Sequence, residues 1–231
     1  MDFYETAVRF FQNGGFFMYP IALVLSMGAA IALERFWFLS KETRANRRDF
    51  EAILPLLRQK RTRELTDMAA RSRSAVCRMM ADGLSRMSGT RRRQDIEYAM
   101  EEQLLEVLPS IERRTPYLAT FANVATLLGL LGTITGLIGA FTAVADADPS
   151  EKAAMLSQSI SIAMNCTAFG LVTAIPLLLI HSFLQNKTNT IVESLEIAMV
   201  KFLNMLEDRP EHQSRPAPET RATPRELAAK A

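Results

Sequence analysis

The fold is decided by the stretch Tyr117–Ala145, which reads YLATFANVATLLGLLGTITGLIGAFTAVA and contains no Lys, Arg, Asp or Glu. A helix needs about 20 predominantly apolar residues to cross a hydrocarbon core of roughly 30 Å. Two further blocks, Phe16–Leu33 and Ala153–Leu184, are similarly free of charge, and densely charged segments separate the three. The sequence therefore predicts an all-α integral membrane protein with three transmembrane helices and long cytoplasmic helical extensions.

The first apolar block has two interpretations. Ala30-Ile31-Ala32 offers the small residues that signal peptidase cleaves after, as in a secretory signal peptide. The segment ahead of the block, however, carries Asp2 and Glu5 against Arg9, whereas a signal peptide begins with positive charge. We therefore expect a retained membrane anchor.

The positive charges predict the orientation. Of the 27 Lys and Arg residues, 17 lie between Lys41 and Arg114, whereas the loop Asp146–Lys152 is short and mainly acidic. By the positive-inside rule the basic segment is cytoplasmic, so the amino terminus is periplasmic and the carboxyl terminus cytoplasmic. The basic segment also holds 12 acidic residues and no set of interleaved aromatic side chains, which favours a solvated helical face over nucleic-acid binding.

Apolar residues at spacings of three and four predict amphipathic helices in the basic segment, with a kink or restart between Pro109 and Pro116. The third span continues outward as one long rod. The expected segments are a periplasmic segment 1–15, transmembrane helix 16–38, cytoplasmic helical loop 39–116, transmembrane helix 117–145, periplasmic loop 146–153, transmembrane helix 154–185, cytoplasmic helix extension 186–207 and disordered tail 208–231.

The second span has a face of small residues and a face of large apolar residues. The small face carries Ala122, Ala125, Thr126, Gly129, Gly132, Thr133, Gly136 and Ala140. Small residues let transmembrane helices approach closely, so this face should pack on protein, while the opposite, Leu-rich face meets membrane lipid. A plain packing seam through Gly132 and Gly136 explains the glycines more readily than the threonines.

The third span repeats the pattern with Ala163, Thr167, Gly170, Ala174 and His181 on one side and Asn165 on roughly the opposite side. A buried Asn in hydrocarbon needs a partner on a neighbouring helix. The threonine hydroxyls could instead bond within their own helices.

No Asp or Glu occurs in any of the three spans. A protein that moves ions by repeated protonation needs a titratable group at membrane depth, so this chain would have to take it from a partner. Cys77 and Cys166 lie in different kinds of segment, and no metal-ligand cluster, nucleotide loop or nucleophile–base pair is evident. We expect no enzyme activity, no metal and no cofactor.

Several motifs together resemble the ExbB/TolQ/MotA proton-channel family, specifically its three-span ExbB/TolQ-like branch. They are Gly14-Gly15 through Tyr19-Pro20-Ile21, Leu33-Glu34-Arg35, Leu128–Thr133 with Gly136 and Phe141, and Thr167–Leu171 with Ala174-Ile175-Pro176. They cover all three spans in order.

The resemblance implies a homopentamer in the bacterial inner membrane. It would enclose the single helices of an ExbD-, TolR- or MotB-like dimer that carries the proton-binding Asp, and it would act on a TonB- or TolA-like effector. By this resemblance Thr133 and Thr167 line the ion pathway, while Gly129, Gly132, Gly136, Gly170, Pro176 and Asn165 serve helix packing. The alternative is a non-conducting scaffold that anchors a periplasmic partner.

One position departs from the family. Many ExbB and TolQ proteins carry a glutamate five residues before the span-three threonine, and this chain has Ile162 there. A mechanism in which the pentamer supplies its own carboxylate is therefore not supported. The sequence leaves open proton or sodium, the effector, and whether the powered process is uptake, envelope maintenance or gliding.

Overall fold

A computed structural model describes residue 11 and residues 14–59, 61–89, 92–145 and 147–207. Within this part of the chain every regular element is a helix. The expected periplasmic segment falls largely, and the expected tail entirely, outside the described residues.

Six helices are described, and three of them are long and apolar enough to cross a membrane. The helices are α2 (Met18–Arg58), α3 (Thr62–Arg71), α4 (Ala75–Gly89), α5 (Arg93–Glu112), α6 (Thr115–Ala145) and α7 (Lys152–Glu207). The candidate spans lie in α2, α6 and α7. The predicted all-α fold with three helices of membrane-spanning length is confirmed.

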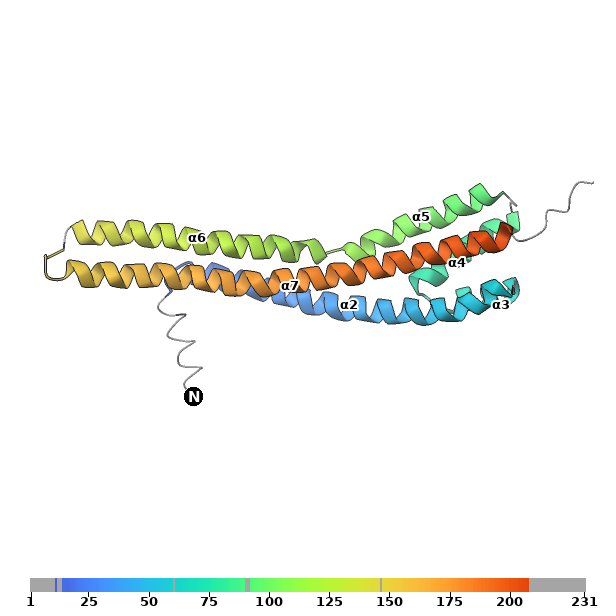
Figure 1. The fold of residues 1–231 in the computed structure, drawn as a ribbon, viewed down its shortest axis with the longest axis horizontal. Helices are drawn as coiled ribbons and strands as arrows, with labels where there is room; N and C mark the ends of the chain where they lie inside the picture. The colour runs from blue at the N-terminus through green and yellow to red at the C-terminus, as the bar shows by residue number, and fades with distance from the viewer. Residues whose placement is uncertain (1–10, 12–13, 60, 90–91, 146, 208–231) are drawn as a thin grey trace, which may run out of the picture.

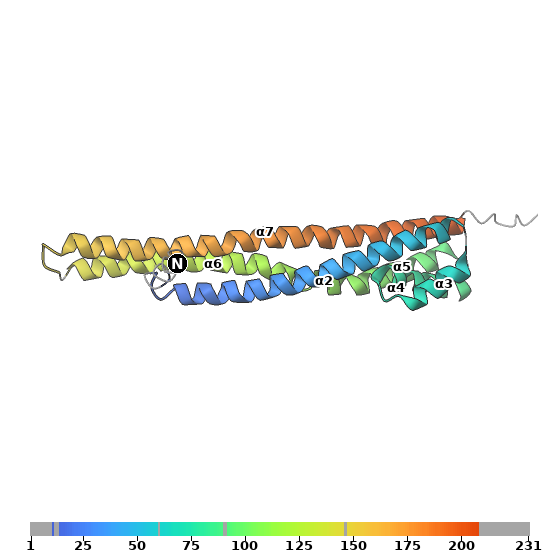
Figure 2. The same ribbon diagram turned by 90° about the horizontal axis from the view of Figure 1, so that it is seen from below.

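The molecule is a long bundle with an apolar end and a charged end. Figure 1 shows α6 and α7 side by side at the apolar end, while α3, α4 and α5 gather around the far half of α7 at the charged end. Turning the molecule by 90° gives the same arrangement (Figure 2). Completely buried residues such as Met80, Met100 and Phe202 form the core of the charged end and belong to one buried cluster that reaches Cys166 at the apolar end. Helix α7 runs along this cluster as a single rod.

Helix α2 begins well inside the length of the α6–α7 pair (Figure 1). A Cβ built on Gly132 of α6 would lie 3.5 Å from the Cβ of Phe17, and one built on Gly15 would lie 3.1 Å from Cγ2 of Ile162 on α7. Gly15 has φ +76°, a conformation that suits glycine. The outer turns of α6 and α7 therefore project past the beginning of α2.

Helices α5 and α6 are separate, with a break at Arg113 and Arg114 that lies between the two prolines. Arg114 has φ +70°, which an L-residue rarely adopts. Its guanidinium lies 3.3 Å from the carboxylate of Glu34 on α2. Arg35, only 3% exposed, donates from Nη2 to the backbone oxygen of Ser110 at 3.3 Å. Two neighbouring residues of α2 thus fix the position where α6 begins.

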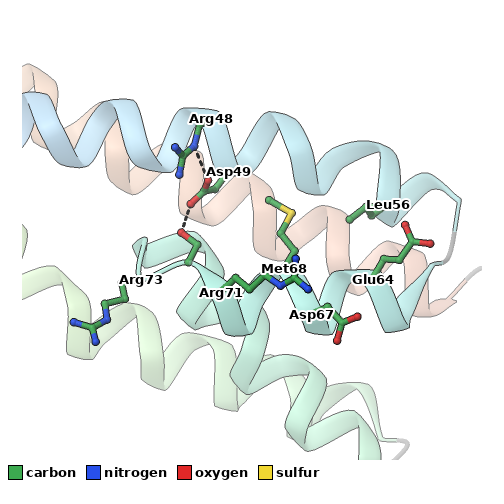
Figure 3. Close-up of a pocket in the computed structure, with 9 residues that line it drawn as sticks. Arg48, Asp49, Leu56, Glu64, Asp67, Met68, Arg71 and Arg73 are labelled. Atoms are coloured by element: carbon green, nitrogen blue, oxygen red, sulfur yellow. Dashed lines mark hydrogen bonds and ion pairs between the residues drawn. The ribbon is translucent and has the colours of Figure 1, made fainter.

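A second junction ties α2 to the start of α4. Buried Asn46 accepts a hydrogen bond from the backbone N–H of Val76 at 3.0 Å, and the Ser74 hydroxyl accepts one from Cys77 N–H at 3.4 Å, so the first turn of α4 is capped. Asp49 lies beside this cap, with its carboxylate 3.8 Å from the sulfur of Cys77. It accepts hydrogen bonds from the Ser72 hydroxyl and from Nε of Arg48 (Figure 3).

Burial by itself raises the pKa of Asp49, but the hydrogen bonds from Ser72, Ser74 and Arg48 outweigh it and hold that pKa below its ordinary value. The carboxylate is therefore charged at neutral pH although the residue is only 3% exposed.

Candidate functional site

Glycines on α6 and α7 allow a close contact between these two helices. A Cβ on Gly170 would stand 2.8 Å from the backbone oxygen of Ala125 and 3.1 Å from Cα of Gly129. A Cβ on Gly129 would stand 3.2 Å from Cα of Thr167. Because these neighbours are backbone atoms, the two helices touch main chain to main chain at this level.

The same seam continues outward along both helices. A Cβ on Gly132 would overlap the sulfur of buried Cys166, and one on Gly136 would come within 2.8 Å of the Cβ of Ala163. Cys166 thus fills the hollow that Gly132 leaves, a contact that the sequence did not indicate. Of the small face expected on α6, Ala122, Ala125, Gly129, Gly132 and Ala140 are buried against the rest of the chain, and Thr126 is exposed.

Thr167 forms a hydrogen bond between the two helices. Its hydroxyl donates to the backbone oxygen of Gly129 on α6 at 2.8 Å. This bond joins helices that are 38 residues apart in sequence at this point, and the side chain is half-buried. The hydroxyl of Thr167 therefore does not bond a carbonyl of its own helix, which was one of the two interpretations offered by the sequence.

Thr133 bonds within its own helix. Its hydroxyl donates to the backbone oxygen of Leu130 at 2.6 Å, and the residue is half-buried. Thr167 bonds Gly129, which is four residues before Thr133 on α6. The two threonines therefore lie within about one helical turn of each other along the seam.

The remaining candidates lie on α7. Asn165 is half-buried, and it forms no hydrogen bond with any other described residue. Pro176 is exposed, and α7 runs through it without a break. Ile162 is half-buried and turns a methyl toward Gly15, an apolar environment that suits isoleucine better than a carboxylate.

The outward faces of both helices are apolar. Exposed side chains on α6 include Leu127, Leu130, Ile134, Leu137, Ile138 and Phe141. Neither Thr115–Ala145 nor Ala153–Asn186 contains a charged residue. Among the described residues there is also no group of three or more His, Cys, Asp or Glu side chains that could hold a metal ion. The hydroxyls of Thr133 and Thr167 are polar groups at the seam between these two charge-free helices.

The contacts of Glu34 with Arg114 and of Arg35 with Ser110 were not predicted from the sequence. Their signal was a charge pair directly after an apolar block, combined with Arg113-Arg114 just before the second span. Arg113 and Arg114 repel each other at the junction between α5 and α6, which favours an ion pair with a nearby acidic residue such as Glu34.

Three spanning-length apolar helices, a glycine seam and a charged helical end define a multi-pass membrane protein. The family model of the MotA/TolQ/ExbB proton channel family matches residues 71–197, more than half of the chain. The chain belongs to this family, as its motifs predicted. The family consists of channel proteins rather than of a known class of enzymes.

Several relatives agree with this assignment. A biopolymer transport protein ExbB homolog of Methanothermobacter thermautotrophicus is 27% identical over 199 residues, which are 85% of this chain and 69% of the relative. The Tol-Pal system protein TolQ of Haemophilus influenzae is 32% identical over 108 residues, 47% of each chain. An ExbB-like biopolymer transport protein of a Synechocystis strain is 28% identical over 186 residues, 75% of this chain and 68% of the relative.

Proposed function

We propose that this chain is the ion-conducting subunit of an ExbB/TolQ-like inner-membrane motor, which converts proton-motive force into mechanical work on the cell envelope. The observation that carries the proposal is the pair of hydroxyls, Thr133 and Thr167, on a seam of charge-free helices inside the family-matched segment. Proton is the proposed ion.

The hydrogen bonds of the two threonines determine what they can bind. A hydroxyl has one proton to donate, and each threonine gives it to a backbone carbonyl, which can only accept. Each oxygen is left with lone pairs. The two threonines can therefore accept a hydrogen bond from a protonated carboxylic acid or a hydrated proton, but they have no proton left for a carboxylate. This favours the protonated form of an acid placed beside them.

The acid has to come from another chain, because the spans of this one contain none. The proposed source is an ExbD-, TolR- or MotB-like dimer, each subunit contributing one span and one Asp. Its helices would lie against the α6–α7 seams of several copies of this chain. The force would then pass to a TonB- or TolA-like effector.

The test replaces hydroxyls with methyl groups. Thr133→Val and Thr167→Val keep side-chain volume and branching, and they should abolish proton flux while co-purification of the partner persists. Thr142→Val is the matched control, because Thr142 also back-bonds on α6, to Ile138 O at 2.6 Å, but lies more than two turns farther out. Flux would be measured with a pH-sensitive dye in proteoliposomes that contain this chain and an ExbD-, TolR- or MotB-like single-span partner.

Normal flux in both variants would refute the pathway role. Lost flux together with lost partner binding would assign the threonines to packing. Absence of flux from the wild-type complex, with the partner bound, would support the second candidate, a scaffold that anchors a periplasmic protein without conducting ions.

We further propose a homopentamer. The exposed apolar residues on α6 and α7 of a single chain can be covered by neighbouring copies as well as by lipid. Native mass spectrometry from mild detergent should show a dominant pentamer, and a dominant monomer or dimer would contradict it.

The proposed orientation places the amino terminus in the periplasm and the charged end in the cytoplasm. Exposed Ser88 on α4 and exposed Ser150 between α6 and α7 provide a matched pair for cysteine substitution. An impermeant maleimide applied to spheroplasts should label Ser150→Cys and leave Ser88→Cys unlabelled. The native cysteines are both buried and serve as the background. The reverse labelling pattern would invert the topology.

A further inference from the structure

A cleft lies between α2 and α7 at the point where the apolar part of α2 gives way to its charged part. It has a volume of about 810 Å³, and its lining includes Phe36, Trp37, Lys41, Arg44 and Lys187. It is separate from the α6–α7 glycine seam and uses none of the residues of the proposed pathway. We call it the interfacial cleft.

The charge of the interfacial cleft is positive. Four cations line it and no Asp or Glu does. Arg48 is neutralised by Asp49, with Nε 3.1 Å from the carboxylate. Lys41 and Arg44 are exposed and form no ion pair with any other described residue. These two charges are therefore available to an anion.

The third available cation, Lys187, is held in place. Its Nζ donates to the Ser40 hydroxyl at 2.8 Å and lies 4.5 Å from the ring centre of Phe36 and 4.9 Å from that of Phe183. Cation–π contacts and one hydrogen bond orient the ammonium group across the gap between α2 and α7. Lys187 is thus already ordered in the free protein, so ligand binding loses less side-chain entropy.

An exposed tryptophan beside the basic residues of the cleft is the arrangement expected at a membrane surface. Trp37 is 76% exposed, and it lies four residues before Lys41 and seven before Arg44, so all three share one face of α2. Tryptophan concentrates where hydrocarbon meets water, and basic side chains just beyond it attract anionic headgroups.

We propose that the interfacial cleft binds the phosphate of an anionic phospholipid in the leaflet next to the charged end, with the glycerol and upper acyl chains against Trp37 and Phe36. A phosphodiester offers the negatively charged acceptor oxygens that Lys41, Arg44 and Lys187 do not find among the described residues. Free phosphate would pair with the cations but leave the indole of Trp37 exposed, whereas a phospholipid would contact both, so we favour the lipid. The bound lipid would bridge α2 and α7.

Trp37 is the only tryptophan of the chain and reports directly on the cleft. The full-length protein would be placed in phosphatidylcholine bilayers containing a small fraction of either dibrominated phosphatidylglycerol or dibrominated phosphatidylcholine. Bromine quenches indole fluorescence on contact, so the ratio of the two quenching curves gives the relative affinity. Brominated phosphatidylglycerol should quench Trp37 at the lower mole fraction.

The variants Lys41→Gln and Arg44→Gln should each lower this preference about fivefold, the equivalent of about 1 kcal/mol per basic residue near an anionic surface. Arg47→Gln is the matched control, because Arg47 is an exposed arginine on the same turn region of α2 but outside the cleft and paired with Glu51 at 2.9 Å. It should keep the wild-type preference.

Equal quenching by the two brominated lipids in the wild-type protein would overturn the proposal, as would the same loss in Arg47→Gln as in Lys41→Gln. Reversal of the quenching by millimolar inorganic phosphate would show a free-phosphate site instead. None of these measurements requires ion flux or a partner, so their outcome is independent of the proposed motor function.

Discussion

Gly170→Ala tests the glycine seam most directly. The added Cβ would meet the backbone oxygen of Ala125 at 2.8 Å and Cα of Gly129 at 3.1 Å, whereas ordinary van der Waals contact begins at 3.4 Å. No side-chain rotation relieves a clash with backbone atoms, so α6 and α7 must move apart by several tenths of an ångström. The hydrogen bond from Thr167 to Gly129 would lengthen with them.

The expected cost follows from three terms. Overpacking costs about 1–3 kcal/mol. Weakening an interhelical hydrogen bond in a membrane protein costs about 0.6 kcal/mol. Alanine in a helix regains about 1 kcal/mol relative to glycine. Gly170→Ala should therefore lower the free energy of unfolding by about 0.5–2.5 kcal/mol.

The matched control is Gly139→Ala on α6, where an added Cβ has nothing within 4 Å. It should leave stability unchanged or raise it by up to about 1 kcal/mol. Unfolding would be followed by circular dichroism as sodium dodecyl sulfate is titrated into dodecyl maltoside micelles. Equal stability of the two variants would refute the argument that main-chain contact at Gly170 sets the distance between the helices.

Two further predictions concern the charged half of the molecule. Arg35→Gln should lower stability by about 1.5–3 kcal/mol in the same titration, because it removes a charge-assisted hydrogen bond to Ser110 O from a buried side chain, while exposed Arg86→Gln should change little. Because the folded pKa of Asp49 lies below its unfolded value, its stabilisation is complete above about pH 4 and is lost as the pH falls through the folded pKa. Asp49→Asn should therefore be less stable at pH 7 and should lack this acid-dependent loss, and an unchanged acid profile would exclude Asp49 as its source.

The sequence correctly predicts those features that depend on the residues of a single helix. Length and freedom from charge identify the apolar parts of α2, α6 and α7, since water-free surroundings demand helices with internally satisfied backbones. The small residues at Gly129, Gly132 and Gly136 predicted a packed face on α6, because side-chain size controls how closely helices approach.

The relations between helices required the structure. Thr167 bonds Gly129 rather than its own helix because the α6–α7 register brings that carbonyl within 2.8 Å, and hydropathy does not fix that register. Arg35 can bond the Ser110 carbonyl because Ser110 lies in the last turn of α5, where backbone oxygens lack partners within the helix. The cap of α4 by Asn46 likewise depends on where a helix 30 residues away in sequence comes to rest.

The level at which α2 begins has a consequence for the proposed pathway. At the outer level, Gly132 of α6 lies beside Phe17, just before α2. At the inner level, Arg114, just before α6, pairs with Glu34 at the other end of the apolar part of α2. The distance along α6 between these levels is about 27 Å at 1.5 Å per residue, close to the thickness of a hydrocarbon core.

Thr133 and Thr167 lie near the outer end of that distance, and the helices carry no charged residue along the rest of it. A proton accepted beside the threonines therefore finds no Asp or Glu along this part of α2, α6 and α7 to receive it on the way to Glu34. Under the proposed function, the partner's helices and the water they admit must supply that part of the path, and movement of the partner relative to the α6–α7 seam is the step at which proton transfer can be coupled to work.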